Sequence, residues 1–313
     1  ISGQEFFGKP DVMVPAMLDA ETRYGLDVAS ITYDVYNIEA EALGQGIRWT
    51  DAGQPDVDRS RPLIERPADL AKIVTPDFRS AHACRRVLAM HSVFTDLTGL
   101  PPGLSFCAPF TLATNLRGIE QFLIDLRESP GFARDLLTRV TDDVLAPWIQ
   151  YQRACFPEAR GVTGVDATAS LPIVTLEILR DWVVPFILRL REQCGTALQV
   201  VNWVGEHQLA HPADMLDLKR EVGCGVLWGQ DPDVERLGAA LYKEYAQTNG
   251  LALILGVGAA FLSTATPVEV AARVRQYVTV GRQGGRFALY LCNVGASTPA
   301  ANLLAAVDAA HSS

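Results

Sequence analysis

The chain has 313 residues, of which 49 % are hydrophobic, and it carries a formal net charge of −9 at pH 7. This length allows one large domain or two small ones, with enough apolar material for a core. The acidic balance, without a block of Lys and Arg to neutralise a row of phosphates, argues against nucleic-acid binding and against binding to anionic membrane surfaces.

Two further features of the composition predict a soluble, cytoplasmic protein. No apolar stretch reaches the ~18 residues of a membrane span, and no signal peptide is visible, although the chain starts abruptly at Ile1 and residues that precede it are not excluded. Scattered cysteines without a CxxC pair are typical of reduced thiols in a cytosolic core. The six cysteines are Cys84, Cys107, Cys155, Cys194, Cys224 and Cys292.

The first 103 residues form the least regular part of the chain. DVMVPAML (11–18) and LDVASITYDVY (26–36) are predicted strands. The segment 50–78 is rich in Pro and Asp, and no second composition regime follows it. It therefore predicts a surface excursion rather than a linker, and we expect residues 1–313 to form a single domain.

From about residue 104 onward, short apolar runs alternate with longer stretches of helical period. The predicted strands are LSFC (104–107), GVTGVD (161–166), ALQVVNW (197–203), CGVLWG (224–229), LALILG (251–256) and RFALYLC (286–292). Helices are predicted up to Leu126, over 131–155, up to Cys194, over 215–222, through Leu237 and Leu241, through 268–274 and over 300–310. The predicted helix starts coincide with Pro130, Pro212, Pro232, Pro267 and Pro299, and Thr266 and Glu269 form a capping signal.

Strands that alternate with helices indicate βαβ units and a parallel sheet. Because the chain offers at least six such units, the sequence favours an α/β fold of the closed (β/α)₈ type, a TIM barrel, over an open doubly wound sheet. It contains no GxGxxG or GxxxxGK[ST] loop that would support a nucleotide-binding version of the open sheet.

Polar side chains follow the predicted strands at their carboxyl ends, where barrel enzymes carry their function. They are Asp166, then Asn202, Glu206 and His207, then Gln230 and Asp231, then Cys292 and Asn293, and finally Glu39 and Glu41 after ITYDVY. We expect all of them to face one rim. Structural alternatives remain for several: Asp166 as a helix cap, Trp203 as a packed side chain and Cys292 as a core thiol.

His207 and His211 have the spacing of a metal-binding pair on one helix face. Pro212 marks a helix that begins later in the chain, so the two rings are not expected to share a helix. We therefore predict no metal site from this pair.

Four segments, in chain order, resemble segments of the uroporphyrinogen decarboxylase superfamily. They are CAPFTLA (107–113), DATASLPIVTLEILRDWVVPFILRLRE (166–192), GVGAAFLSTATPVEVAARVRQYV (256–278) and LCNVGASTPAANLLAAVDAAH (291–311). The resemblance covers most of the chain and implies a (β/α)₈ barrel.

The resemblance favours one of two branches of that superfamily. The decarboxylase branch carries an Arg-Gln-Ala-Gly-Arg-Tyr motif for the carboxylates of its tetrapyrrole substrate, and this chain has only the isolated Arg23 and Arg48 in its early part. YNIEAEALG (36–44) is instead similar to the Glu-Ala-Glu segment of methyltransferases that take a methyl group from methylcobamide.

The thiol-methylating members of this branch bind zinc through His-x-Cys-Gly and a later Cys. Alignment on Gly205 places Asn202 and Val204 where the His and the first Cys belong, and only Cys292 matches. Valine cannot ligate a metal and an amide is a poor zinc ligand. Glu206, His207 and Cys292 form a conceivable substitute set, but the first two are adjacent and would diverge along a strand. The sequence therefore does not predict a zinc site.

The resemblance implies an enzyme that moves a methyl group between a methylcobamide and a small acceptor such as tetrahydrofolate or a thiol. The corrinoid, methylcobalamin for example, would arrive free or on a separate corrinoid protein, because the Asp-x-His-x-x-Gly motif of corrinoid-binding domains is absent. Candidate catalytic residues are Asp166, Asn202, Glu39, Glu41 and His207, with a glutamate as general acid and base. Candidate substrate-binding residues are Trp203, Glu206, Ser170, Cys292 and Asn293.

Two other functions remain open on the sequence. One is a decarboxylase-like lyase that acts on a smaller acid, with Asp166 as the partner of a cationic intermediate. The other is a non-catalytic barrel that binds a tetrapyrrole or a partner protein.

Overall fold

The computed structural model describes residues 1–51 and 53–313, which divide into two compact units. Unit 1 comprises Ile1–Asp19, Ala29–Ala169 and Ile173–Val201, and unit 2 comprises Ala20–Val28, Ser170–Pro172 and Asn202–Ser313. Position 52, within the predicted excursion, lies outside the described residues.

The core of unit 1 is a parallel sheet of three strands. β3 (Leu104–Cys107), β4 (Val162–Val165) and β5 (Leu198–Val201) pair in this order. The sheet packs so closely that a Cβ at Gly164 would lie 2.5 Å from the Phe106 ring. Only glycine fits at this position without a shift of its neighbours.

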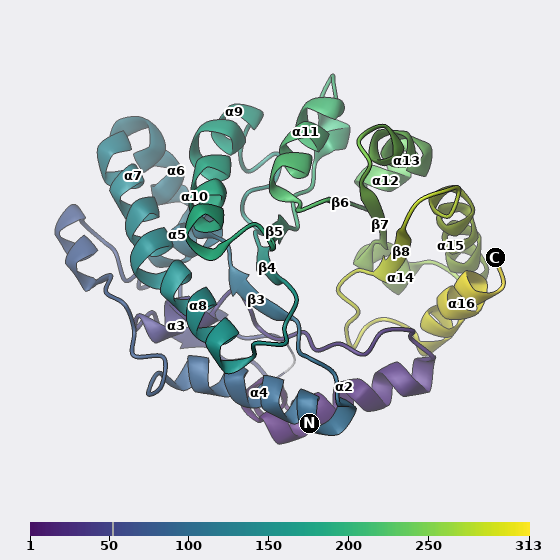
Figure 1. Cartoon of the computed structure of the whole chain (residues 1–313), viewed down its shortest axis with the longest axis horizontal. Coiled ribbons are helices and arrows are strands. Elements are labelled where there is room, and N and C mark those ends of the chain that lie inside the picture. Colours follow the sequence, from purple (N-terminus) through teal and green to yellow (C-terminus); the bar gives the residue numbers. More distant parts are fainter. Residues whose placement is uncertain (52) are drawn as a thin grey trace. The chain divides into compact units, whose positions relative to one another are not determined.

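Helices surround the sheet of unit 1 (Figure 1). They are α1 (Gly3–Gly8), α3 (Ile38–Ala42), α4 (His82–Thr98), α5 (Pro109–Arg117), α6 (Ile119–Glu128), α7 (Pro130–Arg139), α8 (Ala146–Cys155), α9 (Leu176–Ile178) and α10 (Val184–Cys194). A short antiparallel hairpin, β1 (Ile47–Arg48) and β2 (Asp56–Val57), and the 3₁₀ helix η1 (Pro67–Lys72) complete the unit. α2 (Pro10–Tyr24) begins in unit 1 and ends in unit 2.

Two π-helical segments interrupt the long helices of unit 1. η2 (Val140–Leu145) joins α7 to α8, and η3 (Leu179–Val183) joins α9 to α10. The residue after each segment makes an i→i−5 hydrogen bond, Ala146 N to Thr141 O and Val184 N to Leu179 O, and the next residue is a proline in both cases. A proline has no N–H and clashes with the preceding turn of a regular α-helix, so the wider π turn lets each helix continue through it.

Unit 2 is built on a second parallel sheet, in which β6 (Val226–Gln230), β7 (Ala252–Val257) and β8 (Phe287–Leu291) pair in order. Its helices are η4 (Glu206–Gln208), α11 (Ala213–Val222), α12 (Asp233–Leu237), α13 (Ala239–Thr248), α14 (Ala259–Thr264), α15 (Pro267–Gly281) and α16 (Ala300–His311). The predicted cap of α15 is confirmed, because the Thr266 side chain accepts from Glu269 N and the Glu269 side chain accepts from Thr266 N.

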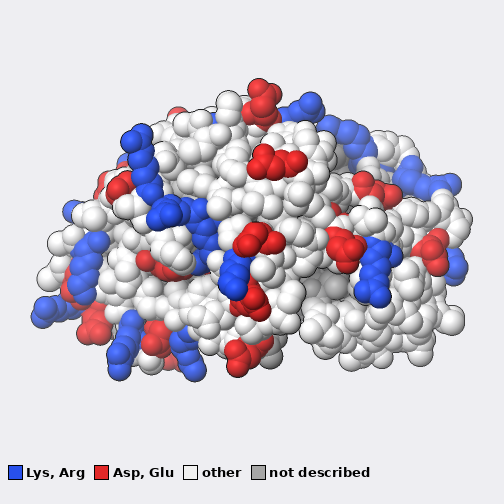
Figure 2. Space-filling model, turned by 90° about the horizontal axis from the view of Figure 1, so that it is seen from below, with Lys and Arg blue, Asp and Glu red and all other residues white. Residues whose placement is uncertain are grey.

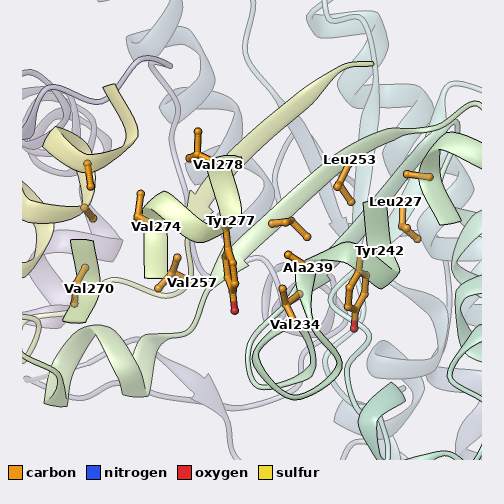
Figure 3. Packing of buried hydrophobic residues seen from close by; sticks show 14 of the residues in the cluster. Leu227, Val234, Ala239, Tyr242, Leu253, Val257, Val270, Val274, Tyr277 and Val278 are labelled. Carbon is orange, nitrogen blue, oxygen red and sulfur yellow. The ribbon is translucent and has the colours of Figure 1, made fainter. Parts of the chain in front are cut away.

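Apolar side chains from the sheet and from α13 and α15 form the core of unit 2 (Figure 3). Leu227 and Leu253 come from the strands, while Val274 and Tyr277 come from α15, and all are buried. Figure 3 shows that the hydroxyl ends of Tyr242 and Tyr277 point to the same side of the cluster. Each hydroxyl leaves the apolar core there and reaches a carboxylate described below.

The sequence prediction is confirmed for the mixed α/β class and for all six strands after residue 104. Both sheets are parallel, and within each sheet neighbouring strands follow one another in sequence. This order lacks the reversal that defines a doubly wound sheet. What the structure establishes is therefore two three-stranded parallel sheets, each covered by helices.

The two strand predictions before residue 104 are wrong. DVMVPAML is part of α2, because Met13 and Met17 and likewise Val14 and Leu18 have the i, i+4 spacing of one helix face. Residues 26–36 contain no strand. Side chains anchor that segment instead of a β-ladder: Tyr33 Oη donates to Ser105 O at 3.2 Å, and Asp34 pairs with a buried arginine.

Surface charge, helix length and cysteine burial can each be compared with the sequence. Basic and acidic side chains are interspersed on the face shown in Figure 2. Among the helices that the structure describes, none is long and apolar enough to cross a membrane. Four of the cysteines are buried as predicted, whereas Cys155 and Cys224 are exposed.

Candidate active site

Asp166 directly follows β4 and is held by hydroxyl groups in unit 1. Its Oδ1 accepts hydrogen bonds from Thr111 Oγ1 at 2.6 Å and from Thr111 N at 3.2 Å. Thr168 N in turn donates to Thr111 Oγ1 at 3.1 Å, and all three residues are buried. Thr111 belongs to the first turn of α5, so the carboxylate caps the helix that precedes it in the sequence rather than the helix that follows.

Glu39 of α3 is a buried carboxyl group with one unsatisfied oxygen. Its Oε1 accepts from Cys107 N, at the end of β3, at 3.2 Å. Its Oε2 has no hydrogen-bond partner in the described part of the chain. Burial raises the pKa of Glu39 from 4.5 to about 8. Glu39 therefore holds a proton at neutral pH and exchanges it near the pH at which enzymes work, as a general acid or base must.

Glu41, two residues away, differs from Glu39 because it forms an ion pair with Arg86 of α4. The buried Arg86 donates through Nη2 to Glu41 Oε2 at 3.2 Å and to Asp34 Oδ2 at 3.1 Å. Its guanidinium also lies 5.3 Å from the centroid of the Trp49 ring. The one guanidinium is thus shared between two carboxylates, while no cation among the described residues pairs with Glu39.

Several buried polar atoms of α3, of α4 and of the segment before α3 lack partners within residues 1–51 and 53–313. They are Arg86 Nε and Nη1, Asp34 Oδ1, Asn37 Oδ1 and Glu39 Oε2. Buried polar groups are nearly always hydrogen-bonded, to protein, to ordered water or to a ligand. A cluster with both donors and acceptors left over has the chemistry to receive a small polar molecule.

The raised pKa of Glu39 predicts a pH signature in stability. Between about pH 4.5 and 8 the unfolded chain has released this proton and the folded chain has kept it, so the contribution of Glu39 to stability falls as the pH rises. Glu39→Gln lacks this effect. From pH 5 to pH 8, we expect the free energy of unfolding of the natural protein to fall relative to that of the variant by on the order of 3 kcal/mol. Urea titrations of both proteins measure this difference, and a constant difference would contradict the assignment.

In unit 2, the loop after β5 begins with Asn202 in a left-handed conformation, at φ +76°. Ser170 Oγ holds this loop, because it donates to Asn202 O and accepts from Val204 N, each at 3.2 Å. A Cβ at Gly205, where φ is +112°, would lie 2.5 Å from Leu171 Cβ. Trp203 of the same loop is buried. Non-glycine residues at positive φ cost energy and concentrate at functional sites, which draws attention to Asn202.

Glu206 in this loop is part of an interior ion pair. Its Oε1 accepts from Lys219 Nζ at 2.5 Å and from Tyr242 Oη at 3.1 Å. Lys219 also donates to Trp228 O at 3.2 Å. Burial raises the pKa of Glu206, and the neighbouring ammonium group opposes this effect. The partners of Glu206 Oε1 are therefore side chains of the protein itself.

His207 contacts Asp233, the first residue of α12. Its ring Nδ1 lies against Asp233 Oδ1, which also accepts from His207 N at 3.0 Å, and Asp233 Oδ2 accepts from Gly205 N at 2.8 Å. Sequence reasoning missed Asp233, because Asp231-Pro232 reads as an ordinary helix start. His207 lies in η4 and α11 begins only at Ala213, so His207 and His211 do not share a helix, as predicted.

Polar groups also gather where β6 and β8 end. Gln230 Oε1 accepts from the Tyr290 hydroxyl and lies 3.9 Å from Cys292 Sγ. Burial raises the pKa of the Cys292 thiol to about 12, so it stays protonated at neutral pH. Asn293 follows in a left-handed conformation at φ +44°.

Asp231 directly follows β6, and both oxygens of its carboxylate accept hydrogen bonds. Its Oδ2 accepts from Gly258 N at 3.0 Å and from Arg273 Nη1 at 3.1 Å, while its Oδ1 accepts from the Tyr277 hydroxyl. Arg273 pairs in addition with Glu235 at 2.7 Å. This network joins the end of β6 to α15.

The predicted site residues thus fall into three groups. In unit 1, Glu39 and Asp166 lie near Cys107, whose pKa is raised by burial and by the ionised form of each carboxyl group, and Glu41 follows Glu39 in α3. In unit 2, the loop after β5 brings together Ser170, Asn202, Trp203, Glu206 and His207. Cys292 and Asn293 lie at the end of β8 in the same unit.

The zinc site of the thiol-methylating branch does not fit this chain. Val204 has no electron pair to offer, and the Cys292 thiol is protonated and contacts Gln230. The residues that the structure describes contain no cluster of three His, Cys, Asp or Glu side chains suited to a metal ion.

Comparisons with known proteins show the family and the fold of the chain. Residues 1–313 match the sequence profile described as "Uroporphyrinogen decarboxylase (URO-D)". A methyltransferase from Methanosarcina mazei is similar in structure, with a TM-score of 0.81 at 18 % identity over 99 % of this chain and 88 % of that one. A B12-independent methionine synthase from Shewanella sp., in complex with selenomethionine, has a TM-score of 0.55 at 14 % identity over 99 % of this chain and 89 % of that one. No curated protein matches. At these identities the two structures establish the shared fold.

Proposed function

Because the chain belongs to the uroporphyrinogen decarboxylase family, we propose that it is a methyltransferase, which moves a methyl group between a methylcobamide and a small acceptor. The observation that carries the proposal is Glu39, a buried carboxyl group whose pKa of about 8 suits proton transfer. It lies among buried donors and acceptors that have no partner within the described residues.

Methyl transfer requires a proton carrier of this kind. When the acceptor atom X of an X–H group attacks the methyl carbon, the X–C bond forms and the cobalt–carbon bond breaks, leaving its electron pair on cobalt. The proton of X–H must then leave, and Glu39 in its carboxylate form takes it. In the reverse direction, demethylation of a methylated donor, protonated Glu39 returns the proton to X.

The pairing of the cations supports methyl transfer over decarboxylation. A substrate with several carboxylates needs cations that are not already neutralised. Three cations are instead matched by carboxylates within the protein: the buried Arg86 by Asp34 and Glu41, the buried Lys219 by Glu206, and the partly buried Arg273 by Asp231 and Glu235. A decarboxylase-like lyase therefore remains the second candidate.

Asn202 and Val204 stand where the zinc ligands of the thiol-methylating branch belong, and this bears on which methyl acceptor we propose. Without a metal to hold a thiolate, we propose a nitrogen acceptor, such as the reduced pterin of tetrahydrofolate, ahead of a thiol. The corrinoid is a substrate that arrives free or on a separate protein. We also propose that the two parallel sheets belong to one closed (β/α)₈ barrel, because neighbouring strands in each follow one another in sequence.

The test is to mix the purified protein with methylcobalamin and candidate acceptors and to follow the absorption spectrum of the corrinoid. We expect methylcobalamin to be consumed only when a reduced pterin is present, with one methylated pterin formed per corrinoid. Absence of any change with every acceptor, together with absence of corrinoid binding, would overturn the proposal. Release of carbon dioxide from carboxylate substrates would favour the lyase.

A further inference from the structure

We infer that His207 and Asp233 form an acid–base dyad, in which Asp233 positions the imidazole so that its Nε2 accepts a proton from the substrate. The inference rests on the proposed function only for the source of that proton, which is the weakly acidic N–H or S–H group that becomes methylated. The orientation and the tautomer of the ring can be tested without any reaction.

The first argument is the set of hydrogen bonds to Asp233. This buried carboxylate accepts from Gly205 N at 2.8 Å and from His207 N at 3.0 Å, and it contacts the ring Nδ1 of His207. Burial opposes its ionisation, yet the hydrogen bonds together hold the pKa of Asp233 below its usual range. Asp233 is thus ionised at neutral pH and has no proton to donate, so the hydrogen between it and the ring sits on Nδ1.

The second argument is what this leaves at the other ring nitrogen. A neutral imidazole with its hydrogen on Nδ1 has a lone pair on Nε2 and accepts there. The hydrogen bonds of His207 to the described residues involve its backbone N and its ring Nδ1, not Nε2, and the side chain keeps 12 % of its surface exposed. A buried carboxylate that fixes one ring nitrogen while the other has no partner is the arrangement that activates histidine bases.

The third argument is that the loop leaves the ring little freedom. Gly205 fits only without a side chain, because of its φ of +112° and its contact with Leu171. Ser170 clamps the backbone on both sides of Trp203. Glu206, the next titratable group, is already paired with Lys219. Of these two titratable side chains, His207 is the one that is partly exposed.

The acceptor releases a single X–H proton, so the dyad is the alternative to Glu39 as the group that takes it. In this step the proton passes to Nε2 as the X–C bond forms. The ring becomes an imidazolium whose positive charge lies against the Asp233 carboxylate, which stabilises it. The proton returns to solvent when the methylated product leaves. Atoms and charge balance without a further reactant.

The decisive measurement is the nitrogen NMR spectrum of the His207 ring in the protein without substrate, at a pH where the ring is neutral. We expect the hydrogen on Nδ1 in the natural protein and a shift of the population toward Nε2 in Asp233→Asn. Asp214→Asn, an exposed aspartate in α11 of the same unit, is the matched control and should leave the ring unchanged. A hydrogen on Nε2 in the natural protein would overturn the inference, even if Asp233→Asn fails to fold.

The second measurement is chemical rescue. His207→Ala should slow methyl transfer by about 10²-fold or more, and added imidazole should restore part of the rate, which a structural role of the ring would not allow. An unchanged rate in His207→Ala would overturn the inference. If the natural protein transfers no methyl group at all, the proposed function fails, whereas the NMR result still decides whether the dyad exists.

Discussion

Replacing Glu39 with glutamine is expected to slow methyl transfer by about 10²–10⁴-fold, the range typical of a lost general acid or base. Glutamine has nearly the same shape and keeps an oxygen for the hydrogen bond from Cys107 N, which is 3.2 Å long in the natural protein. It cannot take up or release a proton, however. The loss should therefore appear in the chemical step rather than in folding.

Single-turnover kinetics, followed through the corrinoid spectrum, measure this effect. Glu65→Gln is the matched control, because Glu65 is an exposed glutamate in the same unit, and its rate should stay near that of the natural protein. A natural rate in Glu39→Gln would show that Glu39 does not carry the proton, and the His207–Asp233 dyad would then be its acceptor.

Replacing Lys219 with methionine should lower the free energy of unfolding by about 3–5 kcal/mol, because it leaves a buried carboxylate without its cation. Glu206 would keep only the Tyr242 hydroxyl, 3.1 Å away. Changing Glu206 to Gln in the same chain removes the stranded charge, so the double variant should recover most of the lost stability.

Urea unfolding of the two variants and of the natural protein measures the effect. Lys9→Met is the control, because Lys9 and Glu5 form an exposed pair, with 57 % and 43 % of their side-chain surfaces accessible, and should change stability by less than about 1 kcal/mol. If Lys219→Met costs no more than the control, the Glu206 carboxyl group is not confined to the interior, and its role as a substrate ligand gains support.

The sequence predicted the second two thirds of the chain better than the first third, for a physical reason. Strands of a parallel sheet are buried on both faces and stand out as apolar runs between helical stretches, as LSFC and LALILG do. The early segments lack such regular alternation. DVMVPAML is an amphipathic helix with a proline inside it, and LDVASITYDVY is held by the side chains of Tyr33 and Asp34.

The sequence offered candidate residues for the site, but not the contacts that distinguish them. The sequence placed Glu39 and Glu41 side by side, yet the difference between them arises from Arg86, which lies 45 residues beyond Glu41 in the chain. The contact between His207 and Asp233 is likewise a tertiary one, 26 residues apart. No local pattern predicts such contacts.

The π-helical segments before Pro147 and Pro185 have a consequence for the tolerance of the gene to small deletions. Each holds one residue more than the α-helical turn it replaces, so removing a single codon from η2 would turn it into a regular α-helical turn and keep the register of the helix after it. Trp148 and Ile149 would stay in the core, but the Pro147 ring would then lie against the carbonyl four residues before it. In-frame losses at these two places should therefore be tolerated only when the proline is replaced as well.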